Sequence, residues 1–222
     1  MKIIQDASLQ GRSALSEYES KQVLASYGIP VTREVLVGDV KDLKTSVQEI
    51  GYPVVLKGCS PEIAHKTEKG MIRVDIRSDA EAVEAFDQIM NNMQGSDGGV
   101  LVQEMVGGKR ELVAGMTRDP QFGPCVMFGL GGIFTEILRD VTFRVAPLEK
   151  RDALEMMQEI KGHKILEQVR GMEAVNLDMM ADILVQVGRI GLENEEVKEV
   201  DINPLIISGS KPVAVDALVV LG

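Results

Sequence analysis

Helical and strand patterns alternate along the first half of the chain. Apolar residues recur at helical spacing in residues 16–27, 40–50 and 78–93, and serines or glycines mark the ends of these segments. Between them lie β-branched stretches bounded by glycine or proline, namely "VTREVLV", "YPVVLKG", "MIRVDI" and "GVLVQEMV", as is typical of strands. The alternation predicts an α+β lobe over residues 1–106.

The second half of the chain has a different order of strand and helix patterns. The segments "RELVAGMTRD", "CVMFGL" and "VTFRVAPL" are strand-like, two helical segments follow at 150–160 and 177–190, and a strand pair closes the chain. The change follows Gly107 and Gly108, which are the best candidates for a hinge. A chain of 222 residues exceeds a single core of roughly 100–150 residues. We therefore predict a second lobe over residues 107–222.

Composition excludes several classes of function. The net charge of −10 repels nucleic acid and anionic lipid, so neither is an expected partner. No apolar run approaches the roughly 18 residues that cross a bilayer, and "MKIIQDASLQGR" lacks the apolar segment of a signal peptide. Cys59 and Cys125 read as reduced thiols. The sequence thus predicts a cytoplasmic protein that does not bind membranes.

The last two strands are predicted to form a hairpin that carries polar residues. If Gly209 and Ser210 are its two-residue turn, Asn203 lies opposite Asp216. Asp201 projects to the same side as Asn203, because side chains alternate along a strand. Carboxylate and amide oxygens are ligands that suit Mg²⁺, which takes its remaining ligands from water and nucleotide phosphates.

The same spacing also fits the polar face of an exposed hairpin. Asn and Asp are common near turns for local hydrogen-bonding reasons. In addition, Pro204 and Pro212 have no amide to donate, so a bulge could shift the register. Spacing alone leaves both interpretations open.

Two further features could serve a phosphate ligand. Lys57 ends the apolar strand "YPVVLKG", and Gly131 and Gly132 belong to the glycine-rich segment "FGLGGIFTEI". Unobstructed backbone amides can line a phosphate site, and a lysine supplies a cation. A solvated lysine at a strand edge and an ordinary glycine turn are the plainer alternatives, and neither GxGxxG nor the P-loop pattern is present.

The order of these motifs resembles that of the ATP-grasp fold. The segments "PVVLK", "VLVQEMV", "RELVAG", "GGIFTEI", "VDINPL" and "VAVDA" follow one another as in that fold, while "SPEIAHKTEKG" and "FRVAPL" resemble the β subunits of ADP-forming acyl-CoA synthetases of the acetate-CoA type. These are relatives of the succinyl-CoA synthetase β subunit. The resemblance implies an α+β fold of two lobes with a nucleotide bound between them.

The resemblance also implies roles for single residues in nucleotide binding. Lys57 matches a residue that contacts the nucleotide phosphates. Glu104, Met105 and Val106 match the strand that lines the adenine pocket, where backbone groups make the polar contacts. Glu111 in "KREL" matches a carboxylate near the ribose.

Other matches concern the metal and the phosphoryl group. Asn203 and Asp216 match the Mg²⁺ ligands, the pair that the hairpin turn brings together. Asp201 matches an acidic position close to where the phosphoryl group is handed on, and Arg144 in "TFRVAPL" matches a position that helps to hold phosphate.

His65 in "AHKTEKG" matches a histidine that shuttles a phosphoryl group. The family interconverts acyl-CoA, ADP and phosphate with free acid, CoA and ATP. A neutral imidazole suits the task because its pKa of about 6.5 leaves a ring nitrogen free to attack near pH 7. Relatives more often have two adjacent glycines after this histidine, whereas here the second is Met71. His163 has no such surroundings and is interpreted as a surface or helix-end residue.

The family implies a partner for this chain. Its CoA-binding α subunit carries its own phosphorylated histidine, and the expected assembly is an α2β2 heterotetramer. Two alternatives remain open: a carboxylate-amine ligase of the same fold, which needs no histidine carrier, and a non-catalytic nucleotide-binding module that regulates an acyl-CoA-handling partner. The acyl substrate and the choice between ADP and GDP cannot be read from this chain.

Overall fold

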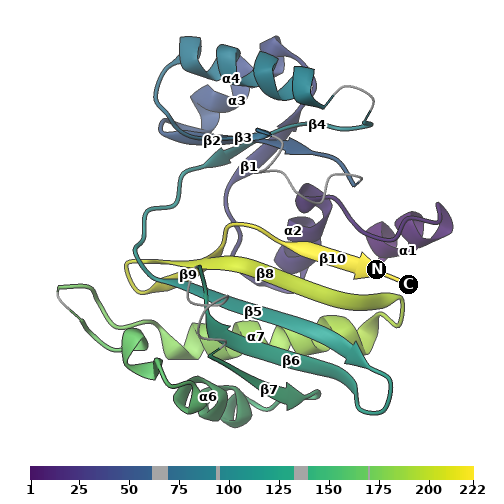
Figure 1. Ribbon diagram of the computed structural model, residues 1–222, viewed down its shortest axis with the longest axis vertical. Helices are drawn as coiled ribbons and strands as arrows, with labels where there is room; N and C mark the ends of the chain where they lie inside the picture. The colour runs from purple at the N-terminus through teal and green to yellow at the C-terminus, as the bar shows by residue number, and fades with distance from the viewer. Residues whose placement is uncertain (62–69, 94–95, 133–139, 170) are drawn as a thin grey trace. The chain divides into compact units, whose positions relative to one another are not determined.

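The computed structural model describes residues 1–61, 70–93, 96–132, 140–169 and 171–222 (Figure 1). The chain forms two compact units. The larger unit comprises Met1–Leu15, Glu19–Val31 and Val106–Gly222, and the smaller unit comprises Ser16–Tyr18 and Thr32–Met105. No helix in these described ranges is long and apolar enough to cross a membrane.

The smaller unit is a four-stranded antiparallel sheet with two helices on one face (Figure 1). The strands have the order β1-β4-β2-β3. Their bounds are β1 (Glu34–Val37), β2 (Val54–Cys59), β3 (Ile72–Ile76) and β4 (Gly99–Glu104), and the helices are α3 (Val40–Ile50) and α4 (Asp79–Asn92). The core between sheet and helices includes Leu43, Val47, Val54, Leu56, Phe86, Ile89, Val100 and Val102.

Local sequence signals explain where these two helices begin and end. The Ser78 side chain accepts a hydrogen bond from the backbone N–H of Glu81 at 3.3 Å, which caps α4 as the sequence predicts. The Asp39 side chain caps α3 through the N–H of Asp42 at 2.8 Å. Helix α3 stops at Gly51, whose φ of 85° is readily adopted by glycine alone.

The larger unit is built on a six-stranded sheet with the order β10-β8-β5-β6-β7, in which β9 also pairs with β8. Its strands are β5 (Glu111–Asp119), β6 (Gly123–Leu130), β7 (Val141–Val145), β8 (Val197–Ser208), β9 (Lys211–Ala214) and β10 (Leu218–Leu221). Helices α6 (Lys150–Glu159) and α7 (Leu177–Glu193) lie along one face (Figure 1). The inward side chains of the sheet pack on α7 in one hydrophobic core.

The division of the chain differs from the expected lobes at 1–106 and 107–222. The change from the smaller to the larger unit does fall between Met105 and Val106, beside the expected hinge, but most of the first 31 residues belong to the larger unit. The physical reason is strand pairing: Ala14 bridges to Val220 and Val31 bridges to Ala214. Pairing across such a long sequence separation leaves no local pattern in the sequence.

The described part of the larger unit also includes α1 (Lys2–Leu9), the short 3₁₀ helix η1 (His163–Leu166) and most of α2 (Glu17–Ser26), whose residues Glu17 and Tyr18 belong to the smaller unit. Helix α2 has its predicted position and ends before Gly28, which has a φ of 78°. Helices α1 and η1 have no counterpart in the sequence prediction.

Candidate functional site

The C-terminal hairpin has the predicted register. Strand β9 pairs with β8 from Ser208, which lies opposite Lys211. Strand β10 pairs with β8 in the same register, with Leu218 opposite Asp201. This register places Asn203 opposite Asp216. Asn203 is exposed, whereas Asp201 and Asp216 are half-buried. The structure therefore brings together the three polar residues that the sequence analysis grouped.

A bulge is present, but on the other side of β8. The register between β5 and β8 shifts between Leu112 and Ala114, which lie opposite the stretch around Asn203 and Pro204. The shift keeps four apolar side chains of β8 in the core on either side of the bulge, namely Val200, Ile202, Leu205 and Ile207. It leaves both Asn203 and Pro204 outside the core and does not disturb the pairing with β9.

The face of the six-stranded sheet that points away from α6 and α7 carries a group of acidic and amide side chains. We call it the acidic face, defined by Glu111, Glu199, Asp201, Asn203 and Asp216. Burial, followed by the negative charges of Glu199 and Asp216, raises the pKa of Asp201 to about 6. A bound cation would offset this crowding of negative charge.

The donors of the acidic face fit Mg²⁺ if a ligand completes the coordination. In the described part of the chain, no group of three or more His, Cys, Asp or Glu side chains could hold a metal ion. The carboxylate of Asp216 and the amide oxygen of Asn203 are hard oxygen donors, and Mg²⁺ commonly takes one or two such protein ligands together with water and phosphate oxygens. The residues present therefore suit a metal that arrives with a nucleotide.

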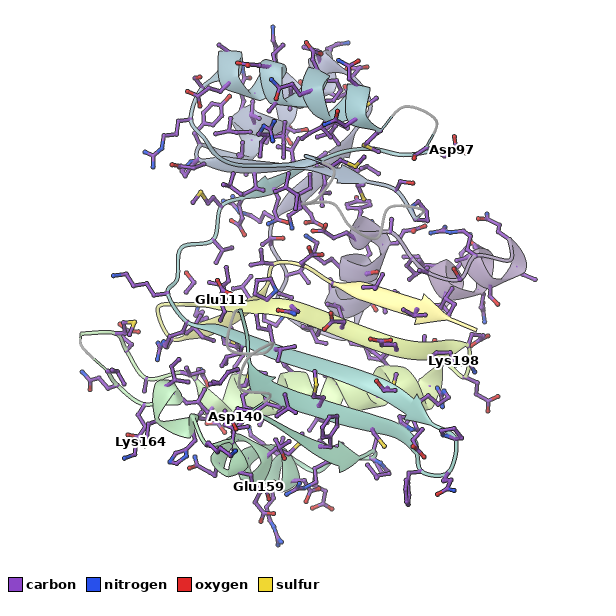
Figure 2. All side chains as sticks on the ribbon, viewed as in Figure 1. Asp97, Glu111, Asp140, Glu159, Lys164 and Lys198 are labelled. Carbon is purple, nitrogen blue, oxygen red and sulfur yellow. The ribbon has the colours of Figure 1, made fainter. Side chains whose placement is uncertain are left out.

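Glu111 and the glycine-rich turn after β6 lie against each other. The N–H of Gly131 donates to the backbone oxygen of Glu111 at 2.8 Å. A Cβ on Gly131 would come within 2.8 Å of the backbone carbonyl carbon of Glu111, and Gly132 has a φ of +64°, so both positions favour glycine. Figure 2 shows Glu111 at the start of β5. Two segments that the sequence analysis assigned to nucleotide binding thus meet at one end of the acidic face.

Lys57 is a buried residue in the smaller unit and not a solvated edge charge. It is 4% exposed, and its Nζ donates to Glu17 Oε1 at 2.7 Å. The adjacent Leu56 packs in the core under α3 and α4, so Lys57 projects from the opposite face of the four-stranded sheet. The ammonium is therefore held in one place by a carboxylate that is itself buried.

Glu17 is the residue of this site that sequence reasoning missed. The available signal was a carboxylate in the first turn of a predicted helix, which is ordinary at that position because of the helix dipole. Its burial and its pairing with a residue 40 positions away are tertiary properties.

The segment from Glu104 to Val106 ends β4 and crosses from one unit to the other. The Glu104 carboxylate accepts hydrogen bonds from the backbone N and from Nε of Arg33, at 2.9 and 2.8 Å. The N–H of Met105 donates to Pro53 O at 3.3 Å, and its side chain is 42% exposed. The Glu104 side chain is thus already occupied, while the Met105 side chain can contact a ligand.

Arg144 does not join the other predicted site residues. It lies opposite Val126, a core residue, so it projects toward the helices and away from the acidic face. Its guanidinium binds Glu159 of α6 and the backbone oxygen of Phe143. Figure 2 shows Glu159 on that helix. A role in phosphate binding would require Arg144 to leave this ion pair.

The structure describes one of the two histidines. His65 lies outside the described residues. His163 lies in η1, where its ring Nδ1 is 3.1 Å from the backbone oxygen of Ile160. This local contact agrees with the interpretation of His163 as a helix-end residue.

Comparison with known proteins identifies the family. The model of the ATP-grasp domain matches residues 6–221. The chain is 47% identical over 224 residues to "Acetate–CoA ligase [ADP-forming] I subunit beta" of Pyrococcus furiosus, covering 99% of this chain and 96% of that one. The chain belongs to the ATP-grasp β subunits of ADP-forming acetate-CoA ligases.

Solved structures of this family agree with the assignment. The dinucleotide-forming acetyl-coenzyme A synthetase 1 of Ca. Korarchaeum cryptofilum, in complex with coenzyme A, Ca-AMPCP and HgCl⁺, matches with a TM-score of 0.95 and 44% identity, covering 100% of this chain and 99% of that one. The same enzyme with Mg-AMPPCP, described with its phosphohistidine segment pointing towards the nucleotide binding site, matches with a TM-score of 0.87 and 45% identity, at the same coverage. The α+β ATP-grasp fold predicted from the sequence is therefore confirmed, and so is the family of acid-CoA ligases.

Proposed function

We propose that this protein is the nucleotide-binding β subunit of an ADP-forming acyl-CoA ligase, which converts acyl-CoA, ADP and phosphate to acid, CoA and ATP through a phosphohistidine. The observation that carries the proposal is the acidic face, where the register that β9 and β10 share on β8 sets Asn203 opposite Asp216. These residues lie in a chain 47% identical to an ADP-forming ligase subunit.

Within this proposal Lys57 contacts the nucleotide phosphates. The bond to Glu17 at 2.7 Å holds the ammonium in place, and a lysine cation attracts the negative charge of phosphate oxygens. Because the stem is buried, the ammonium needs little reorganisation before it binds, which favours electrostatic stabilisation of a transferring phosphoryl group.

Residues at the other predicted positions complete the nucleotide site. Met105 and its neighbours Glu104 and Val106 line the adenine, and Glu111 contacts the ribose. Gly131 and Gly132 bring backbone close to the ligand, as their tight approach to Glu111 allows.

Asn203 and Asp216 would hold Mg²⁺ together with phosphate oxygens. When bound, the ion would neutralise part of the negative charge of the nucleotide phosphates. Asp201 has a raised pKa of about 6, so its carboxyl group gains or loses a proton at a pH not far below neutral. We assign to it the acidic position beside the transferring group.

His65 is the proposed carrier of the phosphoryl group. In the direction of ATP synthesis, a β-phosphate oxygen of ADP attacks the phosphorus on the histidine, the P–N bond breaks, and its electron pair returns to the ring nitrogen. In the reverse direction the neutral ring nitrogen attacks the γ-phosphorus of ATP and ADP leaves. The Ca. Korarchaeum cryptofilum enzyme is described with such a phosphohistidine segment, which supports the assignment.

The proposal includes a CoA-binding α subunit as partner. The Pyrococcus furiosus relative is named as a β subunit, and this chain has no assigned site for thioester chemistry. The α2β2 stoichiometry and the cytoplasmic location remain predictions.

The decisive experiment labels the protein with Mg²⁺ and γ-³²P-ATP. We expect an acid-labile, base-stable label that is lost in His65→Asn, because the amide keeps a polar side chain but lacks the nucleophilic nitrogen. His163→Asn is the matched control and retains the label. A His65→Asn variant that keeps the label, or that supports full ATP synthesis from acyl-CoA with the α subunit, overturns the carrier assignment.

A further inference from the structure

Lys21 is the most deeply buried charged side chain in the described part of the chain that the proposed function does not use. It lies in α2, is 1% exposed, and falls outside every motif of the sequence analysis. Burial of a lysine ammonium is costly unless polar groups compensate for the lost water. Such a residue in the middle of an otherwise ordinary helix calls for a physical reason.

One hydrogen bond of Lys21 reaches the segment that carries a proposed Mg²⁺ ligand. Its Nζ donates to the backbone oxygen of Val215 at 3.3 Å, across a separation of 194 residues. Val215 immediately precedes Asp216. Lys21 therefore binds the chain at the peptide that carries a proposed Mg²⁺ ligand.

This stretch of chain lies in an interruption of the hairpin. The paired residues of β9 end at Ala214 and those of β10 begin at Leu218. The N–H of Val215 still donates to Pro204 O at 3.1 Å. Val215 is thus bound through its N–H by β8 and through its carbonyl oxygen by Lys21.

Neighbouring bonds from the N-terminal segment hold both ends of the same interruption. The N–H of Ala214 donates to Pro30 O at 2.9 Å, and the N–H of Val219 donates to Ser20 Oγ at 3.1 Å. Lys21 follows Ser20 directly and reaches the middle of the span. The contacts from α2 and its flanks therefore cover the segment from Ala214 to Val219.

We propose that Lys21 is a positioning residue for Asp216, which fixes the peptide before it so that the carboxylate is set for a metal-bound nucleotide. The proposal rests on the assignment of Asp216 to Mg²⁺ in the proposed function. Lys21 itself does not touch the nucleotide. Its effect must therefore depend on the presence of Mg²⁺ and on the presence of Asp216.

The experiment is a double-mutant cycle measured by calorimetric titration of ATP, with Mg²⁺ and with EDTA. We expect Asp216→Ala to reduce the gain in affinity due to Mg²⁺ by about tenfold, and Lys21→Met by roughly three- to tenfold, because misplacement of one oxygen ligand weakens the site. Lys21→Met keeps the affinity measured in EDTA. Adding Lys21→Met to Asp216→Ala causes no further loss.

A second measurement needs neither metal nor nucleotide. Hydrogen exchange of the Val215–Ala217 amides is expected to be faster in Lys21→Met than in the wild type, because local opening becomes easier. Lys21→Gln, which keeps a donor group in a shorter side chain, gives the same direction of change if Lys21→Met does not fold. Lys41→Met, at an exposed position of α3, is the matched control and changes neither measurement.

The outcomes separate this inference from the function on which it rests. Equal losses from Lys21→Met with and without Asp216→Ala, or unchanged exchange at Val215–Ala217, overturn the positioning role alone. If Asp216→Ala binds Mg²⁺-ATP as the wild type does, the metal assignment falls and the positioning role falls with it.

Discussion

The two sheets of this protein share an arrangement but carry opposite charges on the faces that point away from their helices. In the smaller unit that face presents Lys57, bonded to a buried carboxylate. In the larger unit it presents Asp201 and Asn203 on β8, together with Asp216 in the segment between β9 and β10. Anionic groups suit the cation of the smaller unit, and a metal cation suits the carboxylate and amide oxygens of the larger unit.

The two faces also differ in how their charges are compensated. The side chains of Lys57 and Glu17 are 6% and 0% exposed, so this ion pair exists before any ligand binds. On the acidic face, by contrast, the charges of Glu199 and Asp216 add to burial in raising the pKa of Asp201. The comparison teaches that the cation of the smaller unit is preorganised by a counter-ion, whereas on the acidic face like charges lie near one another.

The largest expected effect follows from removing the cation of the smaller unit. Lys57→Met should lower the free energy of unfolding by roughly 3 kcal/mol, because the buried Glu17 carboxylate loses a charged partner. It should also weaken ATP binding by at least about tenfold. Chemical denaturation and calorimetric titration measure the two effects.

A double variant separates the two effects of Lys57. Lys57→Met with Glu17→Gln removes both charges, so we expect most of the stability to return while ATP binding stays weak. If ATP binding returns together with stability, Lys57 acts on the fold alone. The proposed contact between Lys57 and the nucleotide phosphates would then be wrong.

The next expected effect concerns stability alone and arises on the acidic face of the metal-free protein. The pKa of Asp201 is raised from 3.8 to about 6, so the folded state binds this proton more tightly than the unfolded state does. Stability from this group is present below pH of about 4 and is lost as the pH rises to about 6. Asp201→Asn should therefore be more stable than the wild type at pH 7, by up to about 3 kcal/mol.

Urea denaturation between pH 4 and pH 8 in the presence of EDTA measures the effect of Asp201→Asn. The difference between variant and wild type should vanish toward pH 4. Parallel stability curves for the two proteins over this range would show that Asp201 is not crowded by charge, and that the acidic face needs no cation.

The smallest effect is expected from Arg144→Ala. Arg144 faces α6 and pairs with Glu159 at the protein surface, so its loss should leave Mg²⁺-ATP affinity unchanged and shift the melting temperature only slightly. Calorimetric titration beside Asp216→Ala checks this. A loss of nucleotide affinity as large as that of Asp216→Ala would return Arg144 to the phosphate site.

The sequence alone determined the parts of the protein that depend on local chemistry. Capping residues and apolar periodicity predicted α3 and α4, and the turn at Gly209 predicted the register that sets Asn203 opposite Asp216. These features follow from backbone geometry over a few residues, since side chains alternate along strands and glycine permits tight turns.

The tertiary structure alone decided which distant segments meet. It placed residues 19–31 with the larger unit and bonded Glu17 to Lys57. It also bonded Lys21 to the backbone oxygen of Val215, the residue before Asp216. It also turned Arg144 toward the helices, because the pairing of β7 with β6 fixes which face each side chain occupies. Contacts between distant residues depend on how whole elements pack and on what burial does to each charge, and neither is written in local spacing.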